Sequence, residues 1–202
     1  MKEYHKIQTV FKRDPETKFK TLLDGDWSMP EFEYLQHNEW VFTEKVDGTN
    51  IRIMCNPYQE IVRAHGVVFG GKTDRAQIPA FLVSALEQMF HGDEQRQKIA
   101  DIFPDGACLY GEGYGPKIQK VGALYRYDPS FVLFDVRVGD WWLTRDAVED
   151  VAKKLGIAVV PIIGVGTLHE MVATTRAGFN SQWGDFRAEG IVARPSTELS
   201  TR

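Results

Sequence analysis

Residues 44–52 read Glu44-Lys45-Val46-Asp47-Gly48-Thr49-Asn50-Ile51-Arg52. A lysine stands here between two stretches rich in apolar residues, and an Asp-Gly pair follows it. This pattern predicts strands over residues 40–43 and 51–55 with a turn between them. Two interpretations of Lys45 follow. It is an exposed lysine of a surface hairpin with a type I′ turn, or it is a nucleophile in a pocket, where desolvation and neighbouring cations favour loss of its proton.

The remainder of the chain mixes helices and strands without strict alternation. Helical periodicity is expected over residues 81–90, after Asp93, and over residues 145–155 and 167–178. Thr167 and Glu170 form a capping box, and Gly156 and Gly178 end two of these helices. Further strands are expected over residues 107–112, 131–138, 158–163 and 189–194. The order predicts an α+β fold with mostly antiparallel sheets flanked by helices.

The composition is that of a globular chain of 202 residues. It is 43% hydrophobic and 26% charged, which excludes disordered, collagen-like and fibrous proteins. A formal charge of −4 argues against a protein coated in basic residues but leaves room for a local basic groove. The polar start and the lack of a long apolar run predict a soluble, cytoplasmic protein. Cys55 and Cys108 have no metal-binding spacing, which argues against a zinc site.

The segment around Lys45 resembles the nucleotidyltransferase superfamily of DNA ligases, RNA ligases and mRNA-capping enzymes. Lys-x-Asp-Gly opens their catalytic domain, and the fuller form here is most similar to the nick-sealing RNA ligases. Four further segments resemble the family's motifs and follow in the family's order. They are residues 70–79, residues 109–120, residues 131–136 (motif III) and residues 189–195 (motif IV).

The resemblance implies an ATP-dependent RNA ligase that works in three steps. Lys45 attacks the α-phosphate of ATP to form lysyl-AMP, AMP passes to a 5′-phosphate end, and a 3′-hydroxyl displaces AMP and seals the strand. ATP is expected rather than NAD⁺ because only 44 residues precede Lys45, too few for the N-terminal module of NAD⁺-dependent ligases. Mg²⁺ or Mn²⁺ is the implied metal, since an attack on a polyanion needs its charge neutralised. The implied partners are RNA or RNA/DNA strand ends, with no membrane and no obligate protein partner.

The resemblance also assigns roles to individual residues. An aromatic ring stacks on a base with about 1–3 kcal/mol, a carboxylate accepts ribose hydroxyl protons, and Mg²⁺ prefers oxygen ligands. Besides the catalytic Lys45, the assignments are Glu44 and Asn50 for the nucleotide and its phosphate side, Lys72 for phosphate, Glu112 for ribose, Phe134 for adenine, Glu189 for metal, and Asp47 and Arg52 for support.

The sequence departs from the family in one respect. The Lys-x-Lys strand of motif V, which normally grips the nucleotide phosphates, is absent after motif IV. The expected organisation is a single nucleotidyltransferase domain over residues 1–202, without motif V and without a C-terminal nucleic-acid-binding appendage. This departure keeps a second interpretation open, a catalytically impaired module that binds a nucleotide or nucleic acid.

A third interpretation is a P-loop NTPase. Residues 66–73 fit Gly-x4-Gly-Lys-Thr with Lys72, and the apolar run ending at Asp135 resembles a magnesium-binding strand. However, three of the four variable positions are Val or Phe, which favour a strand over a phosphate-binding loop. Pro79 would also break the helix that Lys72 should open. The local context therefore disfavours this interpretation.

Overall fold

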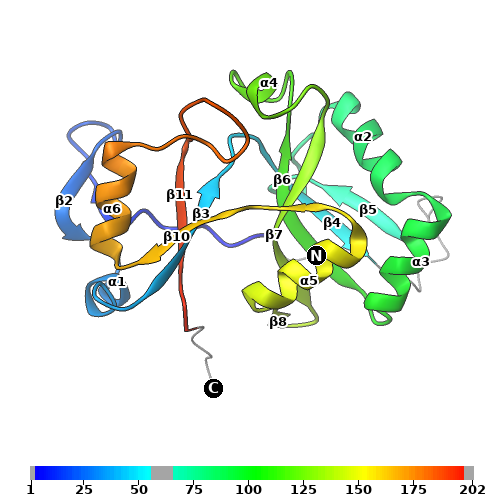
Figure 1. The fold of residues 1–202 in the computed structure, drawn as a ribbon, viewed down its shortest axis with the longest axis horizontal. Helices are drawn as coiled ribbons and strands as arrows, with labels where there is room; N and C mark the ends of the chain where they lie inside the picture. The colour runs from blue at the N-terminus through cyan, green and yellow to red at the C-terminus, as the bar shows by residue number, and fades with distance from the viewer. Residues whose placement is uncertain (1–2, 56–65, 198–202) are drawn as a thin grey trace.

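The computed structural model describes residues 3–55 and 66–197, which form two main sheets and an N-terminal hairpin (Figure 1). The larger sheet has the order β5-β4-β6-β7-β8, and β9 pairs in parallel with β7. Its strands are β4 (Thr49–Cys55), β5 (Val67–Gly70), β6 (Ala107–Tyr114), β7 (Ser130–Val138), β8 (Trp141–Trp142) and β9 (Ala158–Val159). The other named strand pairs are antiparallel, so the predicted α+β fold with mostly antiparallel sheets is confirmed.

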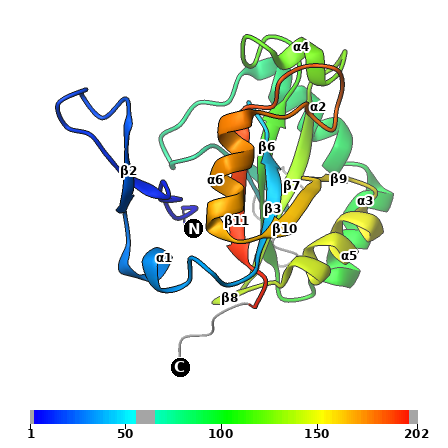
Figure 2. The same ribbon diagram turned by 60° about the vertical axis from the view of Figure 1, so that its left-hand side comes forward.

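The smaller sheet has three strands in the order β10-β3-β11. They are β3 (Trp40–Lys45), β10 (Ile162–Gly166) and β11 (Gly190–Pro195). The hairpin of β1 (Phe11–Arg13) and β2 (Leu22–Trp27) pairs with neither sheet and projects beside α6 (Figure 2), and its Trp27 packs against the apolar cluster that includes Trp40 and Phe42. The helices are α1 (Pro30–Tyr34), α2 (Ala80–Phe90), α3 (Asp93–Ile102), α4 (Gly122–Tyr125), α5 (Arg145–Leu155) and α6 (Leu168–Ala177). None of the helices among these residues is long and apolar enough to cross a membrane.

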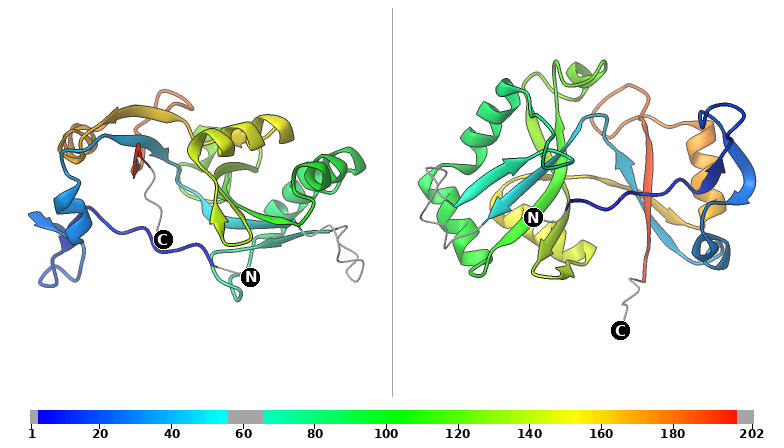
Figure 3. Two further views of the ribbon diagram at one scale, coloured as in Figure 1. Left: turned by 90° about the horizontal axis from the view of Figure 1, so that it is seen from below. Right: turned by 180° about the vertical axis from the view of Figure 1, so that it is seen from behind.

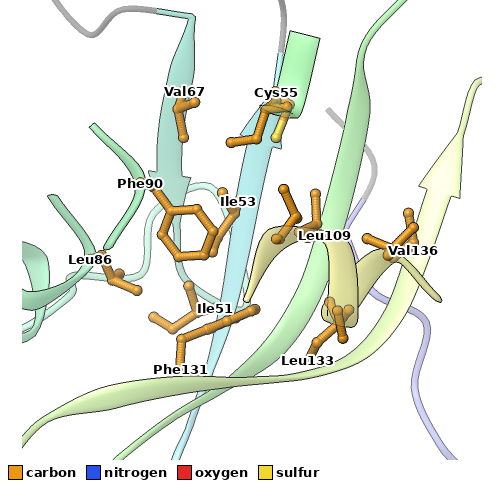
Figure 4. Close-up of a cluster of buried hydrophobic side chains, with 14 of the residues drawn as sticks. Ile51, Ile53, Cys55, Val67, Leu86, Phe90, Leu109, Phe131, Leu133 and Val136 are labelled. Atoms are coloured by element: carbon orange, nitrogen blue, oxygen red, sulfur yellow. The ribbon is translucent and has the colours of Figure 1, made fainter. Parts of the chain in front are cut away.

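Alternation along the strands gives the larger sheet two different faces. Side chains on one face pack under α2, α3 and α5 in a fully buried apolar core that includes Ile51, Ile53, Leu109 and Phe131 (Figure 4). The intervening residues of β4 and β6 therefore point to the opposite face. Figure 3 shows that the helices cover one side of the sheet and that the N-terminal segment crosses the other.

The two strands that flank Lys45 do not form a hairpin. β3 pairs with β10 and β11, whereas β4 pairs with β5 and β6, so residues 46–48 carry the chain from one sheet into the other. A Cβ atom on Gly48 would lie 2.4 Å from the carbonyl oxygen of Gly113, and this close contact, rather than a positive φ, explains the glycine. The hairpin interpretation of Lys45 is therefore wrong.

Residues 158–163 were expected to form one strand, and that prediction is wrong. The run divides into β9, which pairs with β7, and β10, which pairs with β3. Pro161 lies between them and has no N–H to donate to a ladder, so the strand ends there and the chain crosses between the sheets a second time. The helix ends were predicted correctly: Gly156 follows α5 with φ of 67°, and Thr167 and Glu170 form the capping box of α6.

A β-bulge shapes the part of β7 that carries motif III. Gly111 of β6 lies opposite Leu133 and the adjacent Tyr110 lies opposite Asp135, so Phe134 is the extra residue. A bulge changes which face the following residues occupy. As a result, the side chains of Phe134 and Asp135 both lie on the face of the sheet away from the helices, whereas the side chain of Val136 lies in the core.

We predict that Gly48→Ala lowers the free energy of unfolding by about 1–3 kcal/mol, the usual cost of forcing an atom into a packed site. Urea denaturation measures the change. Gly190→Ala is the matched control, because a Cβ atom at Gly190 meets open space. Equal effects of the two substitutions would contradict the tight crossing described above.

Candidate active site

A cleft of about 580 Å³ opens where the two sheets diverge. Its walls come from β3, β4, β6, β7 and β11, from the loop after β5, and from the N-terminal segment. Among the residues that line it are six that the sequence singled out: Glu44, Lys45, Asn50, Lys72, Glu112 and Phe134. Side chains from positions far apart in the chain therefore converge on one cavity.

Lys45 is the last residue of β3, and it lies beside the start of β11 because Gly190 is its register partner. Its Nζ donates a hydrogen bond to Oε1 of Glu189, which does not itself line the cleft, and both side chains are partly exposed. The pair joins the end of β3 to the residue that precedes β11.

Asn50 and Glu112 lie directly opposite each other on β4 and β6. Burial raises the pKa of Glu112 to about 8; the Glu189 and Asp47 carboxylates also raise it, whereas Lys45 and Lys72 oppose the rise. In the absence of ligand this carboxyl group is therefore largely protonated at neutral pH. Oδ1 of Asn50 is buried and has no hydrogen-bond partner among the described residues, and a buried atom of this kind is one that a ligand can satisfy.

Phe134 lines the cleft beside an ion pair that joins the two sheets. Asp135 of β7 accepts hydrogen bonds from Arg194 of β11, including one from Nη1 to Oδ1 at 3.2 Å. Asp135 is only 2% exposed, so its carboxylate is committed to this pair.

The segment around Lys72 does not have the geometry of a P-loop. Lys72 follows strand β5, and α2 begins only after Pro79. Residues 66–79 therefore do not form a phosphate loop followed by a helix, and Asp135 is engaged by Arg194 rather than placed as a metal-binding aspartate.

Glu44 and Arg52 are buried and hold loops in place. Glu44 accepts hydrogen bonds from Oγ of Ser181 at 2.6 Å and from the backbone N–H of Gln182 at 2.7 Å. Arg52 donates to the carbonyl oxygen of Gly71 at 2.7 Å and to Asp74 at 2.8 Å, which fixes the loop that carries Lys72.

Asp47 lies at the crossing and does not line the cleft. Its backbone N–H donates to the hydroxyl of Tyr125 at 3.1 Å, and the carbonyl oxygen of Gly48 accepts from Gln119 at 3.0 Å. These two contacts anchor the segment that follows Lys45 through its backbone, and the supporting role of the Asp47 side chain stays a prediction.

The carboxylates suit a metal that takes most of its ligands from a substrate. In the described part of the chain, no group of three or more His, Cys, Asp or Glu residues is placed to hold a metal ion. Glu189 and Glu112 are close enough to interact electrostatically. Mg²⁺ and similar ions keep several waters and bind through one or two carboxylates plus phosphate oxygens, so Glu189 fits as the protein ligand of such an ion.

Sequence reasoning assigned no role to Tyr4, Lys6 or Arg194, and all three line the cleft. Arg194 lies within the motif IV segment, and its ion pair with Asp135 of the other sheet has no sequence signal. Tyr4 and Lys6 belong to a polar stretch without helical or strand periodicity.

The family model described as RNA ligase matches residues 38–202. Among solved structures, the Naegleria gruberi RNA ligase with pyrophosphate is similar with a TM-score of 0.65 and 17% identity, covering 96% of this chain and 54% of that one. A lysine-to-alanine mutant of that ligase with ATP and Mn gives a TM-score of 0.64 and 19% identity, covering 82% and 48%. The chain thus spans about half the length of these ligases, and the likeness shows the fold. No protein of curated function matches the sequence.

We predict that Glu112→Gln changes the pH dependence of stability. The pKa of Glu112 is near 4.5 when unfolded and about 8 when folded, so wild type loses stability as pH rises between these values, and the variant does not. The stability of the variant relative to wild type should increase by about 1–2 kcal/mol between pH 5 and pH 9, since partial exposure screens the full shift. Urea denaturation at the two pH values measures this. Glu87→Gln, at an exposed position of α2, is the control, and an identical pH response in both variants would contradict the raised pKa.

Proposed function

The chain belongs to the RNA ligase family, and from this premise we propose that it is an ATP-dependent RNA ligase whose Lys45 becomes adenylylated. One observation carries the proposal: Lys45 projects from a strand end into a cleft that also holds a candidate base platform, Phe134, and a candidate phosphate ligand, Lys72. The lysine also contacts a carboxylate, Glu189, that is suited to a metal. The Naegleria ligase structures contain ATP with Mn, AMP with Mn, or pyrophosphate, which supports an adenine nucleotide as the ligand here.

In the first step the Nζ of Lys45 forms a bond to the α-phosphorus of ATP. The bond from that phosphorus to the bridging oxygen breaks, pyrophosphate leaves, and the two protons that the lysine ammonium group gives up pass to solvent. A divalent cation bound with the nucleotide, Mg²⁺ or Mn²⁺, would neutralise phosphate charge. Glu189 would hold it and thereby release Lys45 from the resting ion pair. Lys72 stabilises the negative charge that develops on the phosphates.

The remaining wall of the cleft positions the nucleoside. Phe134 offers an aromatic surface to the adenine, and Glu112 and Asn50 face the ribose and phosphate side from adjacent strands. A protonated Glu112 donates a hydrogen bond, and on losing its proton it accepts two from the ribose hydroxyls. Glu44, Asp47 and Arg52 act indirectly, by holding the segments that carry these groups.

In the later steps AMP passes to the 5′-phosphate of an RNA or RNA/DNA end, and the 3′-hydroxyl of the other end displaces AMP. The chain as a whole serves as one nucleotidyltransferase domain. A cytoplasmic location is part of the proposal, supported by the two cysteines, which are both free and buried. The competing interpretation, an impaired binding module, differs in one observable respect: it binds ATP without forming a covalent adduct.

We predict that the protein incubated with α-labelled ATP and Mg²⁺ retains the label on a denaturing gel and releases it in acid, as a phosphoramidate does. Lys45→Ala and Lys45→Arg should abolish labelling, because neither side chain provides a nucleophilic amine at the strand end. Lys153→Ala, on the exposed face of α5, should label like wild type.

Lys72→Ala separates the proposal from a P-loop enzyme. A ligase that keeps Lys45 should retain a reduced rate of labelling, whereas a P-loop enzyme would lose ATP binding altogether. Labelling that persists in folded Lys45→Ala would refute the ligase assignment. A wild-type protein that binds ATP and is never labelled would support the impaired module.

We predict that Phe134→Ala weakens ATP binding by about 1–3 kcal/mol, or roughly five- to over a hundredfold, because a base loses its stacking surface. Phe134→Leu should recover part of this through apolar contact. Calorimetric titration measures the affinities, and Phe81→Ala, at a partly exposed position of α2, is the control. A loss of thermal stability without a change in affinity would show instead that Phe134 only packs.

A further inference from the structure

The N-terminal segment crosses the nucleotide cleft without forming a helix or strand. Residues 3–9 run along the face of the larger sheet that the helices leave uncovered (Figure 3). Four consecutive residues of this segment, Tyr4 to Ile7, line the same cleft as Lys45. The segment therefore forms part of the cavity surface rather than lying elsewhere on the molecule.

Tyr4 anchors the segment to both sheets. Its hydroxyl donates to Oδ2 of Asp135 at 2.7 Å and accepts from Nη2 of Arg194 at 3.2 Å. Asp135 belongs to β7 and Arg194 to β11, so the tyrosine completes a network that spans the cleft. Burial raises the pKa of Tyr4 and the Asp135 carboxylate adds to the rise, so the hydroxyl keeps its proton and remains a donor.

The ring of Tyr4 also supports the candidate base platform. Its centroid lies 5.0 Å from that of Phe134 with an interplanar angle of 64°, an edge-on arrangement that aromatic pairs favour. Tyr110 and Trp142 contact the other parts of the same ring, with centroids at 5.2 and 5.6 Å. Tyr4 is therefore fixed on several sides and in turn limits where the Phe134 ring can lie.

The charges of the cleft leave two lysines available for an anion. Of the cations that line the cleft, Lys45 pairs with Glu189, Arg194 pairs with Asp135, and Arg145 pairs with Glu149. Within the described ranges, Lys6 and Lys72 have no carboxylate within 4.0 Å. They come from separate segments, and a polyphosphate that must be held for in-line attack needs cations from more than one direction.

We propose that residues 4–7 are a wall of the nucleotide site, in which Tyr4 positions the ring of Phe134 and Lys6 binds the nucleotide phosphates together with Lys72. The inference rests on the proposed function in taking an adenine nucleotide as the ligand. Two arrangements of the segment are possible when a nucleotide binds. In a wall, residues 4–7 stay in place and increase the affinity for the nucleotide. In a plug, they would have to leave the cleft before the nucleotide enters.

Calorimetric titration with ATP and with adenosine, which lacks phosphates, tests the proposal. Lys6→Ala should weaken ATP binding about tenfold and leave adenosine binding unchanged, because only the phosphates meet the ammonium group. Tyr4→Ala should weaken both ligands by a similar factor, because the base platform is disturbed. Tyr4→Phe keeps the ring and should lie between Tyr4→Ala and wild type, and it serves in place of Tyr4→Ala if that variant does not fold.

Two controls are matched to these variants. Gln8→Ala changes an exposed residue of the same segment that does not line the cleft, and Lys20→Ala removes an exposed lysine near the hairpin. Both should bind ATP as wild type does. Tighter ATP binding by Lys6→Ala or Tyr4→Ala would overturn the proposal in favour of a plug, and equal losses for ATP and adenosine in Lys6→Ala would show a merely structural effect.

The outcome is separable from that of the proposed function. If wild type forms lysyl-AMP while Lys6→Ala and both Tyr4 variants keep wild-type affinities, the wall is refuted and the ligase assignment stands. If the variants show the expected pattern but wild type forms no lysyl-AMP, the wall stands and the ligase assignment fails. Failure of wild type to bind ATP would overturn both.

Discussion

The passage of the chain from one sheet into the other immediately after Lys45 is the constraint on which the site depends. The crossing takes residues 46–48 and requires Gly48, because any side chain there would collide with the backbone of Gly113. Two sheets joined by so short a link diverge at the link, and the cleft opens at that point. The second crossing, at Pro161, returns the chain to β3, where the N–H of Glu44 donates to the carbonyl oxygen of Pro161. Lys45 is therefore held between two fixed crossings rather than on a free turn.

The charges around this crossing are balanced in the absence of ligand. Lys45 is neutralised by Glu189 and Arg194 by Asp135, while burial favours the neutral form of Glu112. A nucleotide bound with a metal ion would change this balance. The positive charge of the metal would compete with Lys45 for Glu189, and the negative charge of the phosphates would attract the lysines. Under the proposed function, this balance explains why Lys45 would attack only when a nucleotide and its metal are bound.

Sequence reasoning selected residues that share one cleft, but it did not predict how the cleft is built. Lys45, Asn50, Glu112 and Phe134 converge because each lies on or at the end of a strand that the sequence indicated, in the order of the family's motifs. The assignment of strands to sheets was not predictable, since pairing between residues far apart leaves no mark on local alternation. The bulge at Phe134 likewise has no local signal, as an unbroken apolar run fits a strand with or without it. The N-terminal hairpin and segment were missed because their residues are largely polar and exposed, without helical or strand periodicity.

The central claim is that Lys45, at the crossing between the sheets, is the residue that becomes covalently bound to AMP. Peptide mapping by tandem mass spectrometry of the protein after incubation with ATP and Mg²⁺ tests it most directly, because every lysine of the cleft is read in one experiment. The account predicts AMP on Lys45, with Lys6 and Lys72 unmodified because they contact phosphates without attacking them. An adduct on Lys72 or Lys6, or bound nucleotide with no adduct on any lysine, would contradict it.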